Sequence, residues 1–165
     1  MNKKECFKSG RLLYRGIDES DTEYIVKWRS DTGLIRFFVN NEPVTLQSHI
    51  DWYCNYYLRN NQRFDFIIIE KTSGQKIGTV GASRIDFQKG SCEISYMIAE
   101  LDYRHKGYAS EAVIAIMKRM REEKVHCFYA EIHKDNADSI GLVKRLGWLL
   151  DKHSGDFMTF TISEG

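Results

Sequence analysis

The sequence predicts an α/β fold in which a mixed, largely antiparallel central sheet carries helices on both faces, in the order βααβββαβαββ. Two observations support this prediction. Apolar runs separated by turn residues fill positions 64–98, which is typical of consecutive antiparallel strands. Segments with helical spacing precede and follow them. With 165 residues in total, we expect a single domain spanning residues 1–165.

The N-terminal third alternates between strand and helix signals. A first strand is expected at residues 11–17, and the capping-box spacing at residues 20–23 predicts the start of a helix. A second helix is expected after Pro43, with Thr45 as its N-cap. The apolar face of that helix recurs at helical spacing: Leu46, Ile50, Tyr53, Cys54 and Tyr57.

The remaining elements are predicted from changes in the spacing of apolar residues along the chain. A long amphipathic stripe after Gly107 predicts a helix that packs on the sheet. A further strand, a short helix and a closing hairpin complete the chain. The expected strands are 66–69, 77–85, 92–98, 127–133, 148–153 and 157–162, and the short helix is 136–146.

Composition excludes several classes of protein. Lysine and arginine number 24 against 23 acidic residues, so the net charge of +1 argues against a nucleic-acid or membrane-surface binder. The four cysteines form no Cys-x-x-Cys pair, which favours reduced, buried thiols and makes a metal site unlikely in the expected fold. No long apolar run is present. We therefore expect a cytoplasmic monomer or homodimer that binds neither nucleic acid nor membrane.

The most informative segment is a basic turn that leads into a helix. Cys92 to Ile98 reads as a strand, and after a short loop Arg104 to Ser110 runs directly into the amphipathic stripe. The first N–H groups of a helix lack partners and point at one spot, which makes such a turn an anion site. The cationic residues would add charge-assisted hydrogen bonds to phosphate oxygens. A basic turn of this kind is also compatible with an ordinary solvated loop.

Three motifs in this order resemble the GNAT acetyltransferases. Arg104-x-x-Gly107-x-Ala109 is similar to their pyrophosphate-binding turn, and Glu93 to Ile98 resembles their fourth strand. Asn136-x-x-Ser139 followed by Leu146-Gly147-Trp148 resembles the helix on the pantetheine side and the entry to the next strand. The resemblance covers nearly the whole chain, and it is greatest to the branch that contains ribosomal-protein N-terminal-alanine and small-amine acetyltransferases.

The resemblance implies transfer of acetyl from acetyl-CoA to a primary amine by direct attack, without a covalent enzyme intermediate and without a metal. The pantetheine arm would lie along the fourth strand, and the amide of Ile98 would stabilise the oxyanion. Asn136 would hydrogen-bond the pantetheine chain, although it equally suits a plain helix N-cap. The cofactor-binding residues implied are Met97, Ile98, Ala99, Arg104, His105, Lys106, Gly107, Tyr108, Ala109, Ser110, Asn136 and Ser139.

A general base is needed if the acceptor is strongly basic. At pH 7, deprotonating a lysine costs about 4.6 kcal/mol, whereas a peptide α-amine costs about 1 kcal/mol. Glu93 is the leading candidate, because it alternates with the apolar row of its strand and matches the glutamate that serves as base in histone-type relatives. An ordinary polar residue on a half-solvated face is the alternative interpretation.

Two positions depart from the family pattern. Many relatives place a tyrosine seven residues after the asparagine to protonate the departing thiolate, and here that position is Val143. Tyr108, Ser139 or water would have to donate instead, or the thiolate leaves unaided, since its pKa is about 8.5. The second departure is His105, where relatives often carry glycine; a turn with positive φ there would strain a histidine.

The acceptor is the part of the reaction that the residues define least. Residues 18–63 should shape its pocket, and the aromatic face of the second helix suits either acceptor binding or the core. Ribosomal-protein α-amines, nucleotide-linked amino sugars, polyamines and aminoglycosides all remain open, as does a non-catalytic acyl-CoA-binding module. The candidate acceptor-binding residues are Trp28, Arg29, His49, Trp52 and Tyr53.

Overall fold

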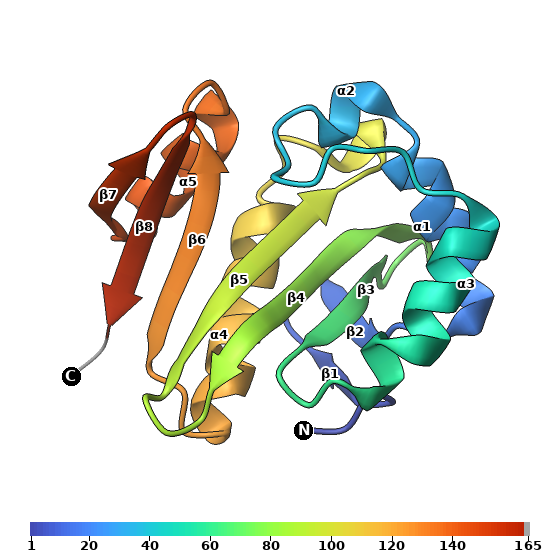
Figure 1. Cartoon of the computed structure of the whole chain (residues 1–165). Coiled ribbons are helices and arrows are strands. Elements are labelled where there is room, and N and C mark those ends of the chain that lie inside the picture. The colour runs from blue at the N-terminus through green and yellow to red at the C-terminus, as the bar shows by residue number, and fades with distance from the viewer. Residues whose placement is uncertain (164–165) are drawn as a thin grey trace.

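The computed structural model describes residues 1–163 as one sheet with helices on both faces (Figure 1). The strands are β1 (Cys6–Lys8), β2 (Leu12–Gly16), β3 (Phe64–Glu70), β4 (Lys76–Asp86), β5 (Ser91–Ile98), β6 (Cys127–His133), β7 (Leu149–Ser154) and β8 (Phe157–Ser163). The α-helices are α1 (Thr22–Arg29), α2 (Thr32–Ile35), α3 (Leu46–Asn55), α4 (Tyr108–Glu122) and α5 (Ala137–Arg145). The 3-10 turns are η1 (Glu19–Asp21), η2 (Tyr57–Arg59) and η3 (Leu101–Tyr103).

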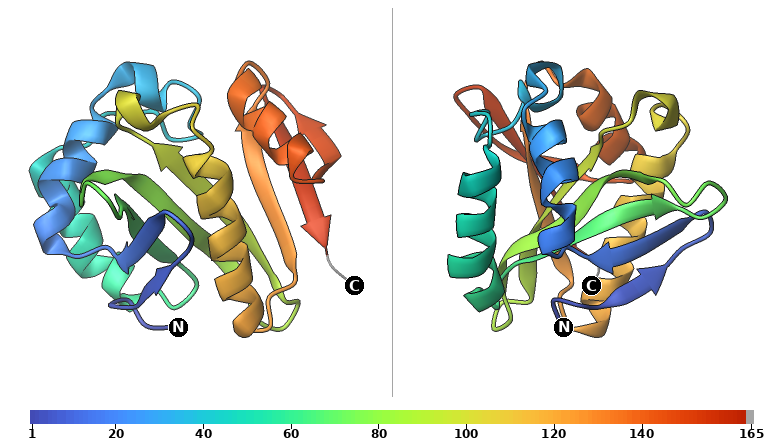
Figure 2. Two further views of the ribbon diagram at one scale, coloured as in Figure 1. Left: turned by 180° about the vertical axis from the view of Figure 1, so that it is seen from behind. Right: turned by 90° about the vertical axis from the view of Figure 1, so that its right-hand side faces the viewer.

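The expected mixed, mostly antiparallel sheet is confirmed. Its strand order is β1-β2-β3-β4-β5-β6-β8-β7, and among the described strands only β5 and β6 run parallel. Helices α4 and α5 cover one face, and α1 and α3 cover part of the other (Figure 2). The parallel pair needs a crossover connection, and α4 supplies it.

Two elements near the N-terminus were not expected. Strand β1 has only three residues, too few to show an alternating pattern, and α2 is a single turn. The predicted capping box at residues 20–23 is wrong by two positions. The box instead joins Asp18 and Asp21, whose side chains accept from Ser20 N and Asp18 N, and it opens η1 rather than α1. The predicted cap of α3 at Thr45 is confirmed.

Two apolar clusters lie on opposite faces of the sheet. The larger packs β2–β6 against the buried stripe of α4, which includes Val113, Ile116 and Met120. The smaller contains Trp28, Tyr57 and Met97 and lies under α1 and α3. Residues of β5 alternate between the clusters because successive strand side chains point to opposite faces. This strand therefore borders both layers of the molecule.

The cysteines are free thiols, as expected, but their expected burial is wrong for three of them. Cys92 is buried, whereas Cys6, Cys54 and Cys127 are exposed. Cys6 and Cys127 are the first residues of β1 and β6, and Cys54 lies in the last turn of α3.

Candidate active site

The basic turn adopts the geometry that an anion site requires. His105 and Gly107 have φ values of 56° and 80°, so the expected strain at His105 is present. Gly107 is the N-cap of α4, and no side chain among residues 1–163 caps this helix end. The first intrahelical bond runs from Glu111 N to Gly107 O. The N–H groups of Tyr108 to Ser110 therefore have no intrahelical partners.

Arg104 has a different orientation from the one expected. Its Nε donates to the Ile98 carbonyl at 3.0 Å, and its Nη2 donates to the Ala99 carbonyl at 2.9 Å. The guanidinium thus connects the turn to the end of β5 rather than pointing at the anion position. His105 and Lys106 are exposed.

A residue that sequence reasoning missed supports the same turn from the other side. Arg11 Nη1 donates to the Lys106 carbonyl at 2.9 Å, and its Nε bridges to Glu111 at 2.8 Å. The guanidinium also stacks over the Tyr108 ring, 4.1 Å from its centroid. Arg11 is 95 residues away from Lys106 in the chain, and no local pattern marks it.

The edge of β5 is open where the turn approaches it. In the described chain, β6 pairs with β5 only from Ser91 to Glu93, and the two strands then diverge (Figure 1). Ala99 N bonds to Ile77 O on β4. Because neighbouring residues of a strand point their N–H groups to opposite sides, the amides of Tyr96 and Ile98 point toward the diverging strand β6. These amides are available to an extended ligand.

Helix α5 faces the same opening. Asn136 accepts from Ser139 N at 3.2 Å and thus caps the helix. Val143 is fully buried and has no donor group. The hydroxyl of Tyr96 is also buried, and within residues 1–163 no side chain reaches it with full hydrogen-bond geometry, although Ser139 lies close enough to interact with it. Burial raises the pKa of Tyr96, while nearby Ser139 and Arg145 act in the opposite direction. This tyrosine was not among the predicted donors.

A cleft of about 460 Å³ lies on the opposite face of the sheet. It is enclosed by α1, α3, the loop after α2, and strands β4 and β5. Three of the five predicted acceptor-binding residues, Arg29, His49 and Trp52, line it. Met97, which was predicted to bind the cofactor, also lines it, and several other lining residues fall within the predicted region 18–63. The remaining lining residues are Ile17, Ile25, Phe38, Asn40, Val44, Ser48, Arg63, Asp65, Thr79, Ser95 and Tyr96.

The other two predicted acceptor-binding residues lie outside the cleft wall. Trp28 is buried, and its Nε1 donates to Glu100 Oε1 at 2.8 Å. Tyr53 is buried and stacks on Tyr57. Both belong to the smaller apolar cluster. Helical spacing alone does not distinguish the core-facing side of α1 or α3 from the cleft-facing side.

His49 presents an unsatisfied nitrogen in this cleft. The side chain is almost fully buried, and Nδ1 lies 3.1 Å from Thr22 Oγ1. Within residues 1–163, Nε2 has no partner. Burial lowers the pKa of His49, although Asp21 and Asp65 oppose the shift. The imidazole is therefore neutral near pH 7, with one nitrogen available to a ligand.

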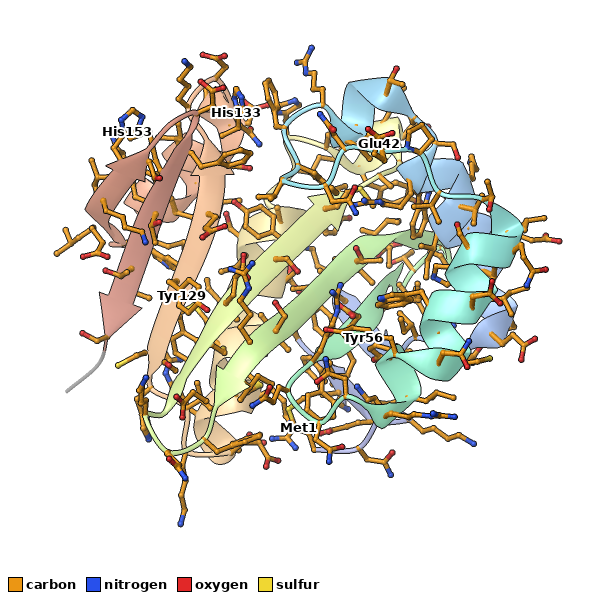
Figure 3. The ribbon with its side chains drawn as sticks, in the orientation of Figure 1. Met1, Glu42, Tyr56, Tyr129, His133 and His153 are labelled. Carbon is orange, nitrogen blue, oxygen red and sulfur yellow. The ribbon has the colours of Figure 1, made fainter. Side chains whose placement is uncertain are left out.

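Glu93 lies beyond the end of the cleft. It shares a sheet face with Ser95, two residues further along β5, and its Oε2 is 3.4 Å from Arg84 Nη1. Burial raises the pKa of Glu93, and Arg84 opposes that shift. Glu93 pairs with Tyr129 of β6, and Figure 3 shows Tyr129 and Tyr56 on either side of the open sheet face. The carboxylate is half-buried but does not line the cleft.

Comparison with known proteins identifies the family. The family model described as an acetyltransferase (GNAT) domain matches residues 11–148. The chain belongs to the GNAT acetyltransferase family. The family expected from the three motifs is therefore confirmed.

Individual relatives of this acetyltransferase act on different amines. An L-methionine sulfoximine/L-methionine sulfone acetyltransferase from Pseudomonas aeruginosa is 30% identical over 114 residues, covering 66% of this chain and 63% of that protein. The chain spans 30% to 63% of the length of the first two curated relatives that it matches.

Solved structures show the same fold at low identity. A spermidine N-acetyltransferase from Vibrio cholerae in complex with CoA and spermine gives a TM-score of 0.85 at 17% identity, covering 94% of this chain and 96% of that one. The ribosomal L7/L12 α-N-protein acetyltransferase RimL in complex with coenzyme A gives 0.82 at 15% identity, covering 96% and 98%. At these identities the likeness shows that the fold is shared.

Two further findings concern the described residues of this acetyltransferase. No three His, Cys, Asp or Glu side chains in residues 1–163 gather in an arrangement that could hold a metal ion. In the same part of the chain, none of the helices combines the length and apolarity needed to cross a bilayer.

Proposed function

We propose that this enzyme acetylates a primary amine that enters the cleft under α1 and α3. The observation that carries the proposal is the position of β5. One face of the strand lines the cleft through Ser95 and Met97, while its edge points unpaired amides toward the diverging strand β6. Strand β5 would therefore bring a thioester bound along its edge close to an amine bound in the cleft.

The residues of the basic turn and β5 would hold the acetyl donor. The free N–H groups of Tyr108 to Ser110 suit a pyrophosphate, because the helix dipole and unpaired amides favour an anion there. The edge of β5 from Met97 to Ala99 would bind the pantetheine arm as an added strand, with Asn136 and Ser139 facing it. Acetyl-CoA supplies an acetyl thioester whose carbonyl oxygen the amide of Ile98 would polarise.

In the proposed reaction, the neutral amine attacks the thioester carbonyl directly through a tetrahedral intermediate. The C–N bond forms, the C–S bond breaks, the amine loses a proton and the thiolate gains one. Glu93 would accept the amine proton through water, because it lies about 7 Å along the strand from cleft-lining Ser95. The buried hydroxyl of Tyr96 would donate a proton toward the leaving thiolate in place of the missing tyrosine at Val143.

Isothermal titration with acetyl-CoA, followed by thiol release over an amine panel, tests this function. We expect binding by the wild-type enzyme and its loss in Gly107→Glu. The panel contains a peptide α-amine, a polyamine, an aminoglycoside and a nucleotide-linked amino sugar. Wild-type affinity in the Gly107→Glu variant, or no binding at millimolar acetyl-CoA, contradicts the proposal. Binding without thiol release from any amine would favour the non-catalytic acyl-CoA-binding module instead.

A further inference from the structure

Arg29 is a cation without an anionic partner in the wall of the cleft. It is half-buried on α1, and its Nη2 donates to the Asn40 carbonyl at 2.7 Å. The guanidinium stacks 5.1 Å from the centroid of Phe38. Among residues 1–163, no carboxylate lies within ion-pair distance of it. Burial first, and then the charge of Arg63, lower the pKa of Arg29, so the protein itself leaves this charge uncompensated.

The other charges in the cleft do not change this balance. Arg63 lines the same cleft and is paired with Asp65, whose Oδ2 lies 2.6 Å from its Nε. Asp65 is the single acidic residue in the described lining of the cleft. One carboxylate therefore faces two guanidinium groups, and the net charge of the wall is 2 − 1 = +1 with His49 neutral.

The acidic residues of the N-terminal region do not supply the missing charge. Asp21 is fully buried and paired with Arg15 and Lys76, at 2.7 Å and 2.8 Å. It lies outside the lining of the cleft, as do the exposed carboxylates of the same region. A polycationic acceptor would thus enter a cleft that already carries excess positive charge.

A partly desolvated cation without a partner is unfavourable unless a ligand supplies the opposite charge. Guanidinium groups suit carboxylate and phosphate oxygens because their donors form a planar fork. Within residues 1–163, only Nη2 of Arg29 donates a hydrogen bond to the protein, so its other nitrogens can bind such a group. The unpartnered Nε2 of His49 lies in the same wall and can donate when Thr22 donates to Nδ1.

We infer that the acceptor is an amine that also carries an anionic oxygen group, a carboxylate or a phosphate, which binds Arg29. The inference rests on the proposed acetyltransferase function and specifies the class of its acceptor. Two sources share this chemistry: amino acids with a free carboxylate, and amino sugars linked to a nucleotide diphosphate. Cationic polyamines are disfavoured as acceptors.

A matched acceptor series tests the inference by initial rates of thiol release. The carboxylate arm compares L-methionine sulfone with its carboxamide and with 3-(methylsulfonyl)propylamine, which lacks the carboxyl group. The phosphate arm compares UDP-glucosamine with glucosamine, and spermidine serves as the cationic acceptor. We expect the anionic member of at least one arm to exceed its uncharged analogues and spermidine in kcat/KM by tenfold or more, mainly through KM.

Variants separate Arg29 from general effects of charge. Arg29→Gln should lower kcat/KM at least tenfold for the preferred anionic acceptor and leave its uncharged analogue within about twofold, the effect expected for losing a charge-assisted hydrogen bond. Arg29→Glu should shift preference toward spermidine. Arg36→Gln is the matched control, because Arg36 is exposed, lies one short helix away and does not line the cleft.

The outcomes distinguish this inference from the proposed function. Acetyl-CoA affinity and thermal stability of each variant show whether the fold and the donor site persist. Three results would overturn the inference while leaving the donor site in place. In each of them the enzyme binds acetyl-CoA, but it prefers spermidine, prefers uncharged amines, or uses no member of the series. An equal loss for charged and uncharged acceptors in Arg29→Gln also overturns it. Absence of acetyl-CoA binding overturns the proposed function itself.

Discussion

Arg104 Nε donates to the carbonyl of Ile98 at 3.0 Å, so the first residue of the basic turn holds the last residue of β5. The same guanidinium reaches the Ala99 carbonyl. The Ile98 carbonyl points away from β4, on the side where the Ile98 amide also lies. A single side chain therefore fixes the turn relative to the strand edge proposed to bind the thioester.

This arrangement predicts that Arg104→Lys impairs acetyl-CoA binding although it keeps the charge. A lysine ammonium cannot reproduce the planar fork that reaches two carbonyls, so we expect the Kd for acetyl-CoA to rise about tenfold, equivalent to about 1.4 kcal/mol. Isothermal titration measures it. Lys106→Gln, which removes an exposed charge from the same turn, is the control. A larger effect in the control would assign the role to charge alone.

Gly107→Ala should weaken acetyl-CoA binding and reduce stability. At φ 80° an alanine costs about 1 kcal/mol relative to glycine, and the shifted backbone would misdirect the N–H groups of Tyr108 to Ser110. Gly155→Ala is a matched control, because Gly155 has φ 59° and open space around its Cα. Both variants should lose similar thermal stability, and only the first should lose acetyl-CoA affinity. An equal affinity in the two variants would contradict the role of the turn.

Tyr96→Phe should lower kcat about tenfold, which is a small effect for the loss of a general acid. The Kd for acetyl-CoA should stay unchanged. Burial raises the pKa of Tyr96, so the hydroxyl stays protonated and able to donate. Because the nearest side-chain partner, Ser139, makes no full hydrogen bond to this hydroxyl, its removal should cost little thermal stability. Tyr108→Phe is the control. Wild-type kcat in Tyr96→Phe would assign the proton to Ser139 or water.

Glu93→Gln should reduce kcat for a strongly basic amine and remove an inflection from its pH profile. Burial raises the pKa of Glu93 above its ordinary value of 4.5, and only the carboxylate accepts a proton. Wild-type kcat should therefore rise with pH through a pKa higher than 4.5. Glu131→Gln, which alters the other carboxylate near Arg84, provides the control. An unchanged profile in Glu93→Gln would eliminate Glu93 as the base.

Asp21→Asn should destabilise the fold by about 2 to 4 kcal/mol, because Arg15 and Lys76 would lose their shared carboxylate. Although burial alone would raise the pKa of Asp21, its bonds to Arg15 and Lys76 outweigh that effect and lower it. The unfolded chain thus binds the proton more tightly. The stabilisation is complete above about pH 3.9 and is lost as pH falls through the folded pKa.

Urea denaturation of Asp21→Asn and wild-type enzyme at neutral and acid pH measures both effects. Asp18→Asn is the control, since Asp18 contacts the same Arg15 but its side chain is 46% exposed, whereas that of Asp21 is fully buried. If both variants lost the same stability at neutral pH, the burial of Asp21 would not explain how much its ion pairs stabilise the fold.

Most of the fold could be predicted because the signals for its elements are local. The alternation in β5, the stripe of α4 and the Thr45 cap each depend on residues a few positions apart. The exceptions were β1 and α2, which are too short for a period to appear, and the capping box, where Asp18 proved the better placed acceptor. The succession of strands predicted a mostly antiparallel sheet. It did not predict that the pairing of β5 with β6 stops after Glu93.

The sequence by itself determined all the main strands and helices except β1 and α2, the order of those elements, the glycine-bearing turn at α4 and the family to which its motifs belong. These properties depend on backbone preferences and side-chain period over short stretches of chain. Only the tertiary structure decided that Arg11 and Arg104 hold the turn, that Trp28 and Tyr53 belong to the core, and that Arg29 stands without a carboxylate partner. The physical reason is that these features depend on the direction in which each side chain points and on contacts between separate elements, such as the contact of Arg11 with Lys106, 95 residues away in the chain.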